Sequence, residues 1–393
     1  MAGMKLADRM ARLGTESAFE VLARARALEA AGVDVLHLEI GEPDAATPAH
    51  IVAAAQEALA RGLTHYVPAP GTPELRAAVA AFLERTGRLR TSPDRVVVTP
   101  GAKPIMFFTI LALCQPGDEV LYPDPGFPMY ESIAAFAGAR PVPVPLREAN
   151  RFRMDPGELA SLVTDRTRLV ILNSPHNPCG SGLTTDDVEA IAEVAIEHDL
   201  VVLSDEVYWA IRYGGGHPSV LQVDGMAERT VLLDGWSKTF AMTGWRLGFG
   251  VLPAPLVEPV TRLVVNSVSC TAAFSQHAAI AALEGPWAPV EAMVASLRER
   301  RDLVVAGLNA IEGIACQEPD GAFYAFPRVA SLDLPAAALA DRLLAEAGVA
   351  CLPGTAFGGY GEGYLRLSYA TGADTLRRAL ERIGGLVGGL AGT

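Results

Sequence analysis

The sequence predicts an α/β fold: a large domain in which helices cover a mostly parallel sheet, and a smaller α+β domain. Between residues 96 and 233, short apolar strands alternate with stretches of helical periodicity, which is typical of a parallel sheet covered on both faces. From about Pro286 this alternation stops, and a long helix and a mixed segment follow. A chain of 393 residues is also too long for one ordinary core, so we expect two domains.

The N-terminal part predicts one strand between helices. Residues Glu16–Ala31 carry apolar side chains at the spacing of one helix face. The run VLHLEI, Val35–Ile40, indicates a strand, and the turn GEPDAATP follows it. We then expect helices at Ile51–Arg61 and Pro73–Arg85, the second with a proline in its first turn as a start signal.

The central part predicts the strands and helices of the large sheet. The expected strands are Val96–Thr99, Glu119–Tyr122, Leu169–Leu172, Leu200–Leu203 and Thr230–Leu233. The expected helices are Pro104–Cys114, Met129–Ala137 and Thr185–His198, and the long helix of the last part is Val290–Ile311. We therefore assign residues 51–285 to the large domain, and both chain ends, residues 1–50 and 286–393, to the small domain.

Composition narrows the classes of partner. A formal net charge of −13 and a pI near 5.1 disfavour binding to nucleic acid or to anionic membranes. No apolar run is long enough for a membrane span. The odd number of scattered cysteines favours a reducing cytoplasm. The seven histidines show no paired metal-binding spacing, so we expect no metal.

The most informative residue is Lys238, in the stretch VLLDGWSKTFAMTGWRLGFG. It follows a buried strand, and Arg246 comes eight residues later, before Gly248 and Gly250. A lysine amine whose pKa is lowered by its surroundings can condense with an aldehyde. The stretch resembles the cofactor-lysine signature of the class I/II aminotransferases, which are fold-type I pyridoxal-phosphate (PLP) enzymes.

Further polar clusters follow the other strands, and ligands of open α/β sheets lie beyond the carboxyl ends of strands. TPGAKP opens a helix, where the backbone N–H groups of Gly101, Ala102 and Lys103 suit an anion. The resemblance implies that these residues and Arg246 bind the cofactor phosphate. It also implies the ring contacts, which come from DPGFPMY, NSPHNPCG and SDEVY: Phe127 stacks on the ring, Asn177 and Tyr208 bond its phenolic oxygen, and Asp205 pairs with its nitrogen.

Three more motifs complete the resemblance, which extends from about Glu16 to Ile383. Arg366 in YLRLSYA matches the arginine that binds the substrate α-carboxylate, and Gly41 in IGEPD matches a glycine beside it. Tyr66 in THYVPAPG matches a tyrosine that reaches the phosphate of the neighbouring subunit, which implies a homodimer.

Two details of the motif leave questions open. Many family members carry a serine hydroxyl three residues before the cofactor lysine, where this chain has Gly235; Ser237 is the nearer hydroxyl. Lys103 matches a lysine that lies near a distal substrate carboxylate in some aspartate-type members. A role for Lys103 at the cofactor phosphate, or a position facing solvent, fits the sequence equally well.

The motifs and the resemblance that they carry predict a PLP-dependent transfer of an amino group from an L-amino acid to a 2-oxo acid of the 2-oxoglutarate type. Lys238, Asp205 and Tyr208 would be its catalytic residues. Other carbanion reactions on the same scaffold, such as C–S β-elimination, decarboxylation or cyclisation, remain alternatives. A ligand-sensing regulator domain is a further alternative, although the residues ahead of Glu16 show no DNA-binding pattern.

Overall fold

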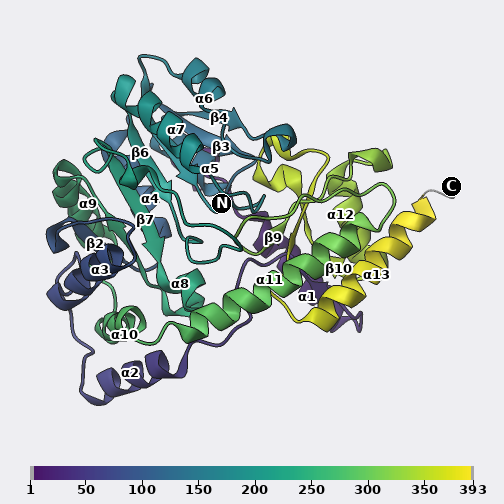
Figure 1. Ribbon diagram of the computed structural model, residues 1–393, viewed down its shortest axis with the longest axis horizontal. Coiled ribbons are helices and arrows are strands. Elements are labelled where there is room, and N and C mark those ends of the chain that lie inside the picture. Colours follow the sequence, from purple (N-terminus) through teal and green to yellow (C-terminus); the bar gives the residue numbers. More distant parts are fainter. Residues whose placement is uncertain (1–3, 391–393) are drawn as a thin grey trace.

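The computed structural model of the protein describes residues 4–390, and a seven-stranded sheet forms its centre (Figure 1). The strand order is β2-β8-β7-β6-β5-β3-β4, and β8 alone runs antiparallel to its neighbours in this described sheet. The strands are β2 (Val96–Thr99), β3 (Glu119–Asp124), β4 (Arg140–Pro145), β5 (Thr167–Asn173), β6 (Val201–Asp205), β7 (Thr230–Gly235) and β8 (Gly248–Val251). The prediction of a mostly parallel sheet is confirmed.

Helices cover both faces of this sheet because successive strand residues point to opposite sides. In β5, Leu169 and Ile171 pack against α4, α5 and α9, while Val170 and Leu172 pack against α6 and α7. Helices α2, α3 and α10 cover the end of the sheet near β2. The bounds are α2 (Ala49–Ala60), α3 (Pro73–Arg85), α4 (Lys103–Leu113), α5 (Met129–Ala137), α6 (Pro156–Leu162), α7 (Thr185–Glu197), α8 (Trp236–Thr239), α9 (Ala254–Ser267) and α10 (Ala273–Glu284).

A second core joins the two ends of the chain. Leu36 in β1 pairs with Val349 in β10, and residues from both segments share one apolar cluster. This agrees with the expectation that the N-terminal strand joins the C-terminal part, while the domain bounds stay a prediction. The elements are α1 (Ser17–Ala30), β1 (Leu36–His37), α11 (Ala288–Asn309), β9 (Tyr324–Ala325), α12 (Ala336–Ala347), β10 (Val349–Ala350), β11 (Leu352–Pro353), β12 (Leu365–Ser368) and α13 (Ala373–Leu390).

Some elements differ from the prediction, for identifiable reasons. The expected strand Val35–Ile40 is shortened to β1. Strand β4 was not predicted because its alternate prolines weaken the pattern, and it lies at the sheet edge, where proline is tolerated. Strand β8 was not predicted either. Its Gly248 packs so closely on α4 that a Cβ there would lie 2.2 Å from the backbone nitrogen of Ala102.

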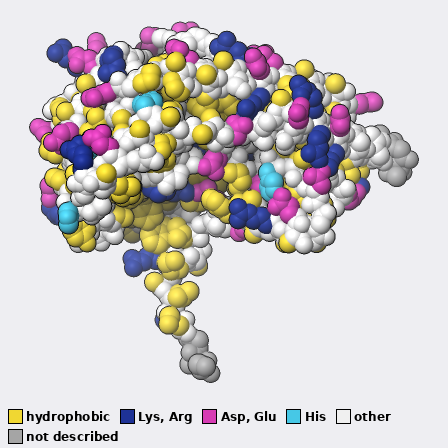
Figure 2. Space-filling model, turned by 90° about the horizontal axis from the view of Figure 1, so that it is seen from below, with side chains coloured by type: hydrophobic (Ala, Val, Ile, Leu, Met, Phe, Trp, Pro, Cys, Tyr) yellow, Lys and Arg dark blue, Asp and Glu magenta, His cyan; other side chains and the backbone are white. Residues whose placement is uncertain are grey.

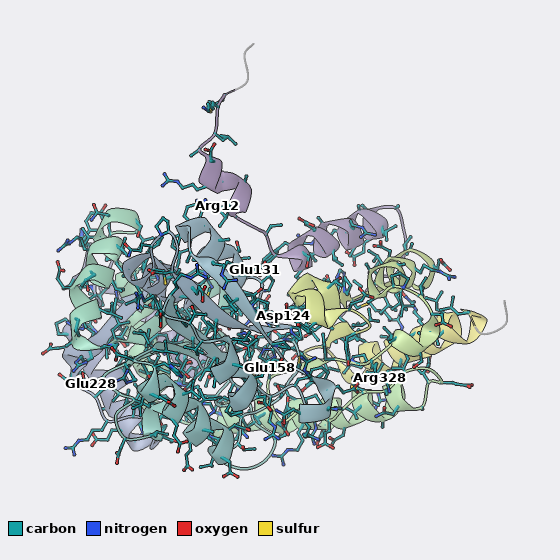
Figure 3. All side chains as sticks on the ribbon, turned by 90° about the horizontal axis from the view of Figure 1, so that it is seen from above. Arg12, Asp124, Glu131, Glu158, Glu228 and Arg328 are labelled. Atoms are coloured by element: carbon teal, nitrogen blue, oxygen red, sulfur yellow. The ribbon has the colours of Figure 1, made fainter. Side chains whose placement is uncertain are left out.

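A short N-terminal arm projects from the body of the molecule (Figures 2 and 3). It carries the 3-10 helix Asp8–Arg12, in which no residue is buried. Met4, Leu6 and Met10 on this arm are exposed apolar side chains. Such side chains contribute nothing to the core of their own chain, so the arm has apolar surface that can pack against another molecule.

No helix within residues 4–390 is long and apolar enough to cross a membrane. The cysteines are free thiols, and all of them lie in the described part: Cys114, Cys179, Cys270, Cys316 and Cys351. In the same part of the chain, His, Cys, Asp and Glu side chains form no cluster of three or more that could hold a metal ion.

Candidate active site

A pocket of about 520 Å³ lies at the carboxyl edge of the large sheet. Asn173, Asp205 and Gly235, the last residues of β5, β6 and β7, line it. The structure thus brings most of the expected site residues together. The predicted residues that line the pocket are Gly41, Ala102, Lys103, Phe127, Asn177, Asp205, Tyr208, Lys238, Arg246 and Arg366.

Lys238 lies on α8, the short helix that follows β7. Its amine donates a 2.5 Å hydrogen bond to the carbonyl of Gly41 and lies near the rings of Tyr208 and Phe323. Burial lowers the pKa of Lys238 to about 8, with Arg366 and Arg246 adding to the effect and Glu42 and Glu16 opposing it. A substantial share of this amine is therefore neutral near pH 8 and able to attack an aldehyde.

Asp205 is the buried carboxylate of the pocket. The hydroxyl of Tyr130 donates a 2.7 Å hydrogen bond to it, and the backbone N–H of Val207 donates one of 3.3 Å. Burial nevertheless raises the pKa of Asp205 to about 7, and these two hydrogen bonds only partly offset that effect. A cation beside this carboxylate would stabilise its charged form, so the position suits a protonated ring nitrogen.

A buried arginine also lines the pocket. Arg366 in β12 donates to the carbonyl of Glu39 and, at 3.4 Å, to the side-chain oxygen of Asn177. Its guanidinium lies 4.6 Å from the ring centre of Tyr324. Its Nε is buried without a hydrogen-bond partner among the described residues, so a donor remains for a carboxylate.

Two tyrosines and a glycine shape the wall beside Arg366. The hydroxyls of Tyr208 and Tyr324 are 2.8 Å apart. Burial raises the pKa of Tyr208 well above its usual range, so its hydroxyl stays a neutral hydrogen-bond donor. A Cβ at Gly41 would lie 2.1 Å from the Tyr324 hydroxyl, so this close approach requires glycine.

The turn before α4 forms an anion cradle with Arg246. Gly101 has a φ of 91°, and a Cβ on it would meet the Arg246 guanidinium at 2.2 Å. Arg246 itself has a φ of 55°, an unfavourable conformation for a residue with a side chain, and its Nη1 donates to the carbonyl of Thr243. The guanidinium and the N-terminus of α4 thus face the same space, which suits a phosphate.

Lys103 has a partner that sequence reasoning did not anticipate. Its ammonium forms an ion pair with Glu16, and it lies 5.3 Å from the ring centre of Phe127. Neither the phosphate role nor the substrate role considered for Lys103 included this carboxylate.

Gly235 differs from the family serine for a local reason. A Cβ at this position would lie 2.9 Å from the carbonyl oxygen of Leu247 in the adjoining chain segment. A serine would therefore require the backbone to shift. Ser237 lines the pocket, so a hydroxyl is available two residues later.

Tyr66 is not part of this pocket within the single chain. Its side chain is 90% exposed. An isolated aromatic ring with this exposure contributes little to its own chain, and its predicted role requires a second subunit.

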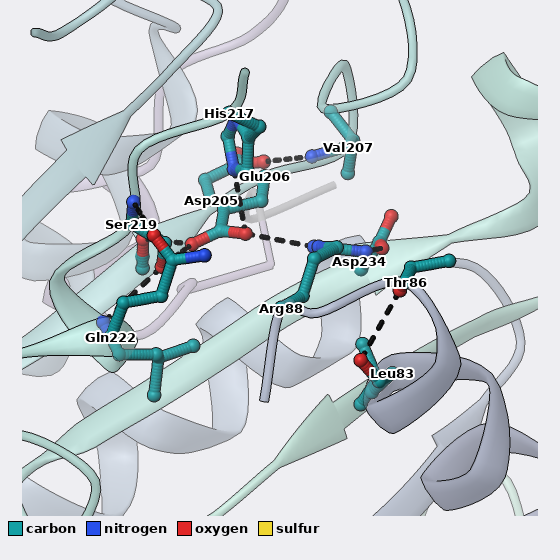
Figure 4. Close-up of polar contacts among 12 residues, drawn as sticks. Leu83, Thr86, Arg88, Asp205, Glu206, Val207, His217, Ser219, Gln222 and Asp234 are labelled. Carbon is teal, nitrogen blue, oxygen red and sulfur yellow. Dashed lines mark hydrogen bonds and ion pairs between the residues drawn. The ribbon is translucent and has the colours of Figure 1, made fainter. Parts of the chain in front are cut away.

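A buried ion network lies behind the ends of β6 and β7 (Figure 4). The guanidinium of Arg88, 3% exposed, bonds Asp234 at 2.6 Å and Glu206 at 2.8 Å. His217 and Ser219 also contact Glu206. Burial alone would raise the pKa of Glu206, but His217 and Arg88 outweigh it and lower this pKa. The network links the ends of β6 and β7, the strands that precede Tyr208 and Lys238.

Sequence reasoning missed several residues of the site. Tyr130 and Asn173 stood within the motifs considered, but nothing in the sequence showed that they bond Asp205. Tyr324 and Glu16 lie outside those motifs. Only a signal for contacts between distant segments could have found them.

One small molecule would satisfy these groups together. An amine able to attack an aldehyde shares a pocket with a turn that favours an anion and with a carboxylate that has no cationic partner in the described part of the chain. Pyridoxal phosphate carries the aldehyde, the basic ring nitrogen and the phosphate, so the residues present fit it. The class of protein that this fold and pocket define is the fold-type I PLP enzymes.

Comparisons with known proteins identify the family. The model of the family "Aminotransferase class I and II" matches residues 33–383, so the chain belongs to that family. It is 45% identical to an aspartate aminotransferase of Pyrococcus abyssi, over 90% of this chain and 92% of that protein. It is 41% identical to aromatic-amino-acid aminotransferase 2 of Thermococcus litoralis, over 97% of each chain.

A solved structure agrees. The aspartate aminotransferase of Thermus thermophilus with maleate has a TM-score of 0.94 at 37% identity, covering 98% of this chain and 100% of that one. The resemblance predicted from the sequence is thereby confirmed, as are dependence on PLP and the activity of an amino-acid aminotransferase.

The lowered pKa of Lys238 predicts how the apoprotein captures PLP. Only the neutral amine attacks the aldehyde, so the rate should rise with pH through a midpoint near 8 and then level off. Borohydride trapping at timed intervals, followed by peptide mapping, measures this rate at Lys238. Nα-acetyl-lysine, whose only reactive amine is the side-chain amine, serves as the control. If the rate at Lys238 reached its midpoint at a pH as high as that of the control, the prediction would be contradicted.

Proposed function

We propose that Lys238, Asp205, Tyr208 and Arg366 carry out the transamination, and that Arg246 with the Gly101 turn holds the PLP phosphate. One observation carries this proposal: the amine of Lys238, whose pKa is lowered, and the buried carboxylate of Asp205 line the same pocket. When bound, PLP supplies an aldehyde that links to an amine and a ring that accepts the electrons of the broken Cα–H bond.

The cofactor ring would be held on three sides. Phe127 stacks on one face, and Asn177 and Tyr208 donate to the phenolic oxygen. Asp205 accepts from the protonated ring nitrogen and keeps it charged. The hydrogen bond from Tyr130 fixes the direction of the Asp205 carboxylate, so the pair forms without reorientation.

Arg366 would position the substrate. Its guanidinium forms a two-pronged contact with the α-carboxylate, beside the backbone of Gly41. This contact places Cα near Lys238, whose amine already lies at Gly41. Lys238, once released from the cofactor, takes the α-proton as a base and returns a proton as an acid.

The homodimer is part of this proposal. Tyr66 is exposed in the single chain and would reach the phosphate of the partner subunit. The exposed apolar arm offers additional surface for the same association (Figure 3). A cytoplasmic location, L-amino-acid donors and an acceptor of the 2-oxoglutarate type complete the proposal. Relatives named for aspartate and for aromatic amino acids support donors of both kinds.

A half-reaction tests transamination against the other carbanion reactions. Each PLP converted by an amino acid should give one 2-oxo acid and one pyridoxamine phosphate, measured by absorbance and mass spectrometry. In the Lys238→Ala variant the rate should fall roughly 10²- to 10⁴-fold because the general base is lost, while PLP still binds. Release of ammonia, CO₂ or sulfide without pyridoxamine phosphate would reject the assignment.

The dimer proposal predicts a dependence on Tyr66. Light scattering should give twice the 41.4 kDa mass of one chain. Tyr66→Phe, which removes only the hydroxyl, should weaken PLP binding by about 1.5–3 kcal/mol, the usual contribution of one hydrogen bond to a charged group such as a phosphate. Tyr360→Phe is the matched control, because it removes a hydroxyl from another exposed tyrosine, one that does not line the pocket. A fully active monomer, or unchanged PLP affinity in Tyr66→Phe, would refute the proposal.

A further inference from the structure

Glu16 and Lys103 form an ion pair at the mouth of the pocket. Glu16 immediately precedes α1, and Lys103 is the first residue of α4, so the pair links two helices from different parts of the fold. Both residues line the pocket. Their side chains are 20% and 46% exposed, respectively, which means that the pair stays in contact with solvent.

Lys103 is the cation that the proposed function leaves free for a substrate side chain. Within residues 4–390, the cationic residues of the pocket lining are Lys103, Lys238, Arg246 and Arg366. In the proposed function Lys238 is the base, Arg246 holds the phosphate and Arg366 holds the α-carboxylate. A second carboxylate, as in aspartate or 2-oxoglutarate, then has Lys103 as its remaining cationic partner.

Glu16 stands in the way of that contact because it already occupies Lys103. A dicarboxylic substrate would bring its distal carboxylate to the same ammonium. This carboxylate and that of Glu16 would then lie close together and repel each other. The pair itself is weak, since ion pairs that stay in contact with water contribute little, so a substrate can displace Glu16.

Uncharged side chains would not meet this obstacle. The Phe127 ring lies beside Lys103, and Phe19 and Phe357 line the same pocket. A phenyl or aliphatic side chain can pack against these rings while Glu16 keeps Lys103 neutralised. An unpaired Lys103 would instead present a bare charge to such a substrate, at a desolvation cost.

We propose that Glu16 is a specificity-determining residue: a carboxylate of the chain itself that competes with dicarboxylic substrates for Lys103. The inference rests on the proposed function, because it requires that amino and 2-oxo acids bind with their side chains toward Lys103. Glu16 thereby lowers the preference for aspartate-type substrates and raises the tolerance for uncharged ones.

The Glu16→Gln variant tests this directly, because it removes the charge and keeps the shape. Two measurements on the PLP-loaded enzyme are needed. Calorimetry gives the Kd of maleate, a dicarboxylate that does not react, and of 3-phenylpropanoate, its uncharged-side-chain counterpart. Half-reaction kinetics give the ratio of kcat/KM for aspartate to that for phenylalanine. This ratio cancels any effect of Glu16 on the amine of Lys238, which both donors share.

The expected result is that Glu16→Gln binds maleate about tenfold more tightly, with a similar rise in the aspartate-to-phenylalanine ratio. Glu20→Gln is the matched control: it removes the same charge from the exposed surface of α1, one turn away, and should leave both quantities unchanged. In a Lys103→Ala background, Glu16→Gln should no longer change the affinity for maleate, because the ammonium for which Glu16 and maleate compete is absent.

An unchanged or weakened maleate affinity in Glu16→Gln overturns the inference and makes Glu16 a support for Lys103. An effect that persists in the Lys103→Ala background also overturns it, because Glu16 would then repel substrates without competing for Lys103. Neither result touches the proposed function, which fails separately if no amino acid yields pyridoxamine phosphate.

Discussion

Three acidic residues are buried where β6 and β7 end, and the site depends on how their charges are balanced. Asp205 and Glu206 end β6 and begin its loop, and Asp234 lies beside Gly235 in β7. Isolated carboxylates in such a place would be expensive, so each needs a partner. Arg88 holds Glu206 and Asp234, and His217 also bonds Glu206. Asp205 receives hydrogen bonds, but within residues 4–390 no cationic side chain pairs with it. That difference supports the proposal that Asp205 pairs with the ring nitrogen of the cofactor.

The rest of the pocket follows from the strand ends that this network holds. Arg88 bonds Glu206, next to Asp205, and Asp234 in β7, so it links the carboxyl ends of these two paired strands. Lys238 is placed at Gly41, where the close contact with Tyr324 requires glycine. Elements of the fold thus position the proposed cofactor contacts, while the pair of Glu16 and Lys103, which we propose faces the substrate, is partly exposed. Buried cofactor contacts combined with an ion pair that a substrate can displace suit an enzyme that binds two different substrates in turn.

Local patterns predicted much of this, and contacts between distant segments account for what they missed. The parallel sheet and the positions of Lys238, Asp205 and Arg246 follow from motifs at the ends of apolar strands. The prolines of β4 and the glycines of β8 concealed strands whose reasons are tertiary: a sheet edge and a close helix. The partnership of Glu16 with Lys103 joins residues far apart in sequence, so no local pattern indicates it. The role proposed for Tyr66 involves a second subunit, and its side chain is accordingly exposed in the single chain.

The central claim is that the charge of Asp205 assists the reaction by keeping the ring nitrogen protonated. The direct measurement is the single-turnover rate of Asp205→Asn with PLP bound, beside thermal unfolding as a check on the fold. Asparagine keeps the shape but loses the charge, so the account predicts bound PLP, a native-like melting temperature and a rate roughly 10²- to 10³-fold lower. A folded, PLP-loaded Asp205→Asn enzyme with a near-native rate would contradict it.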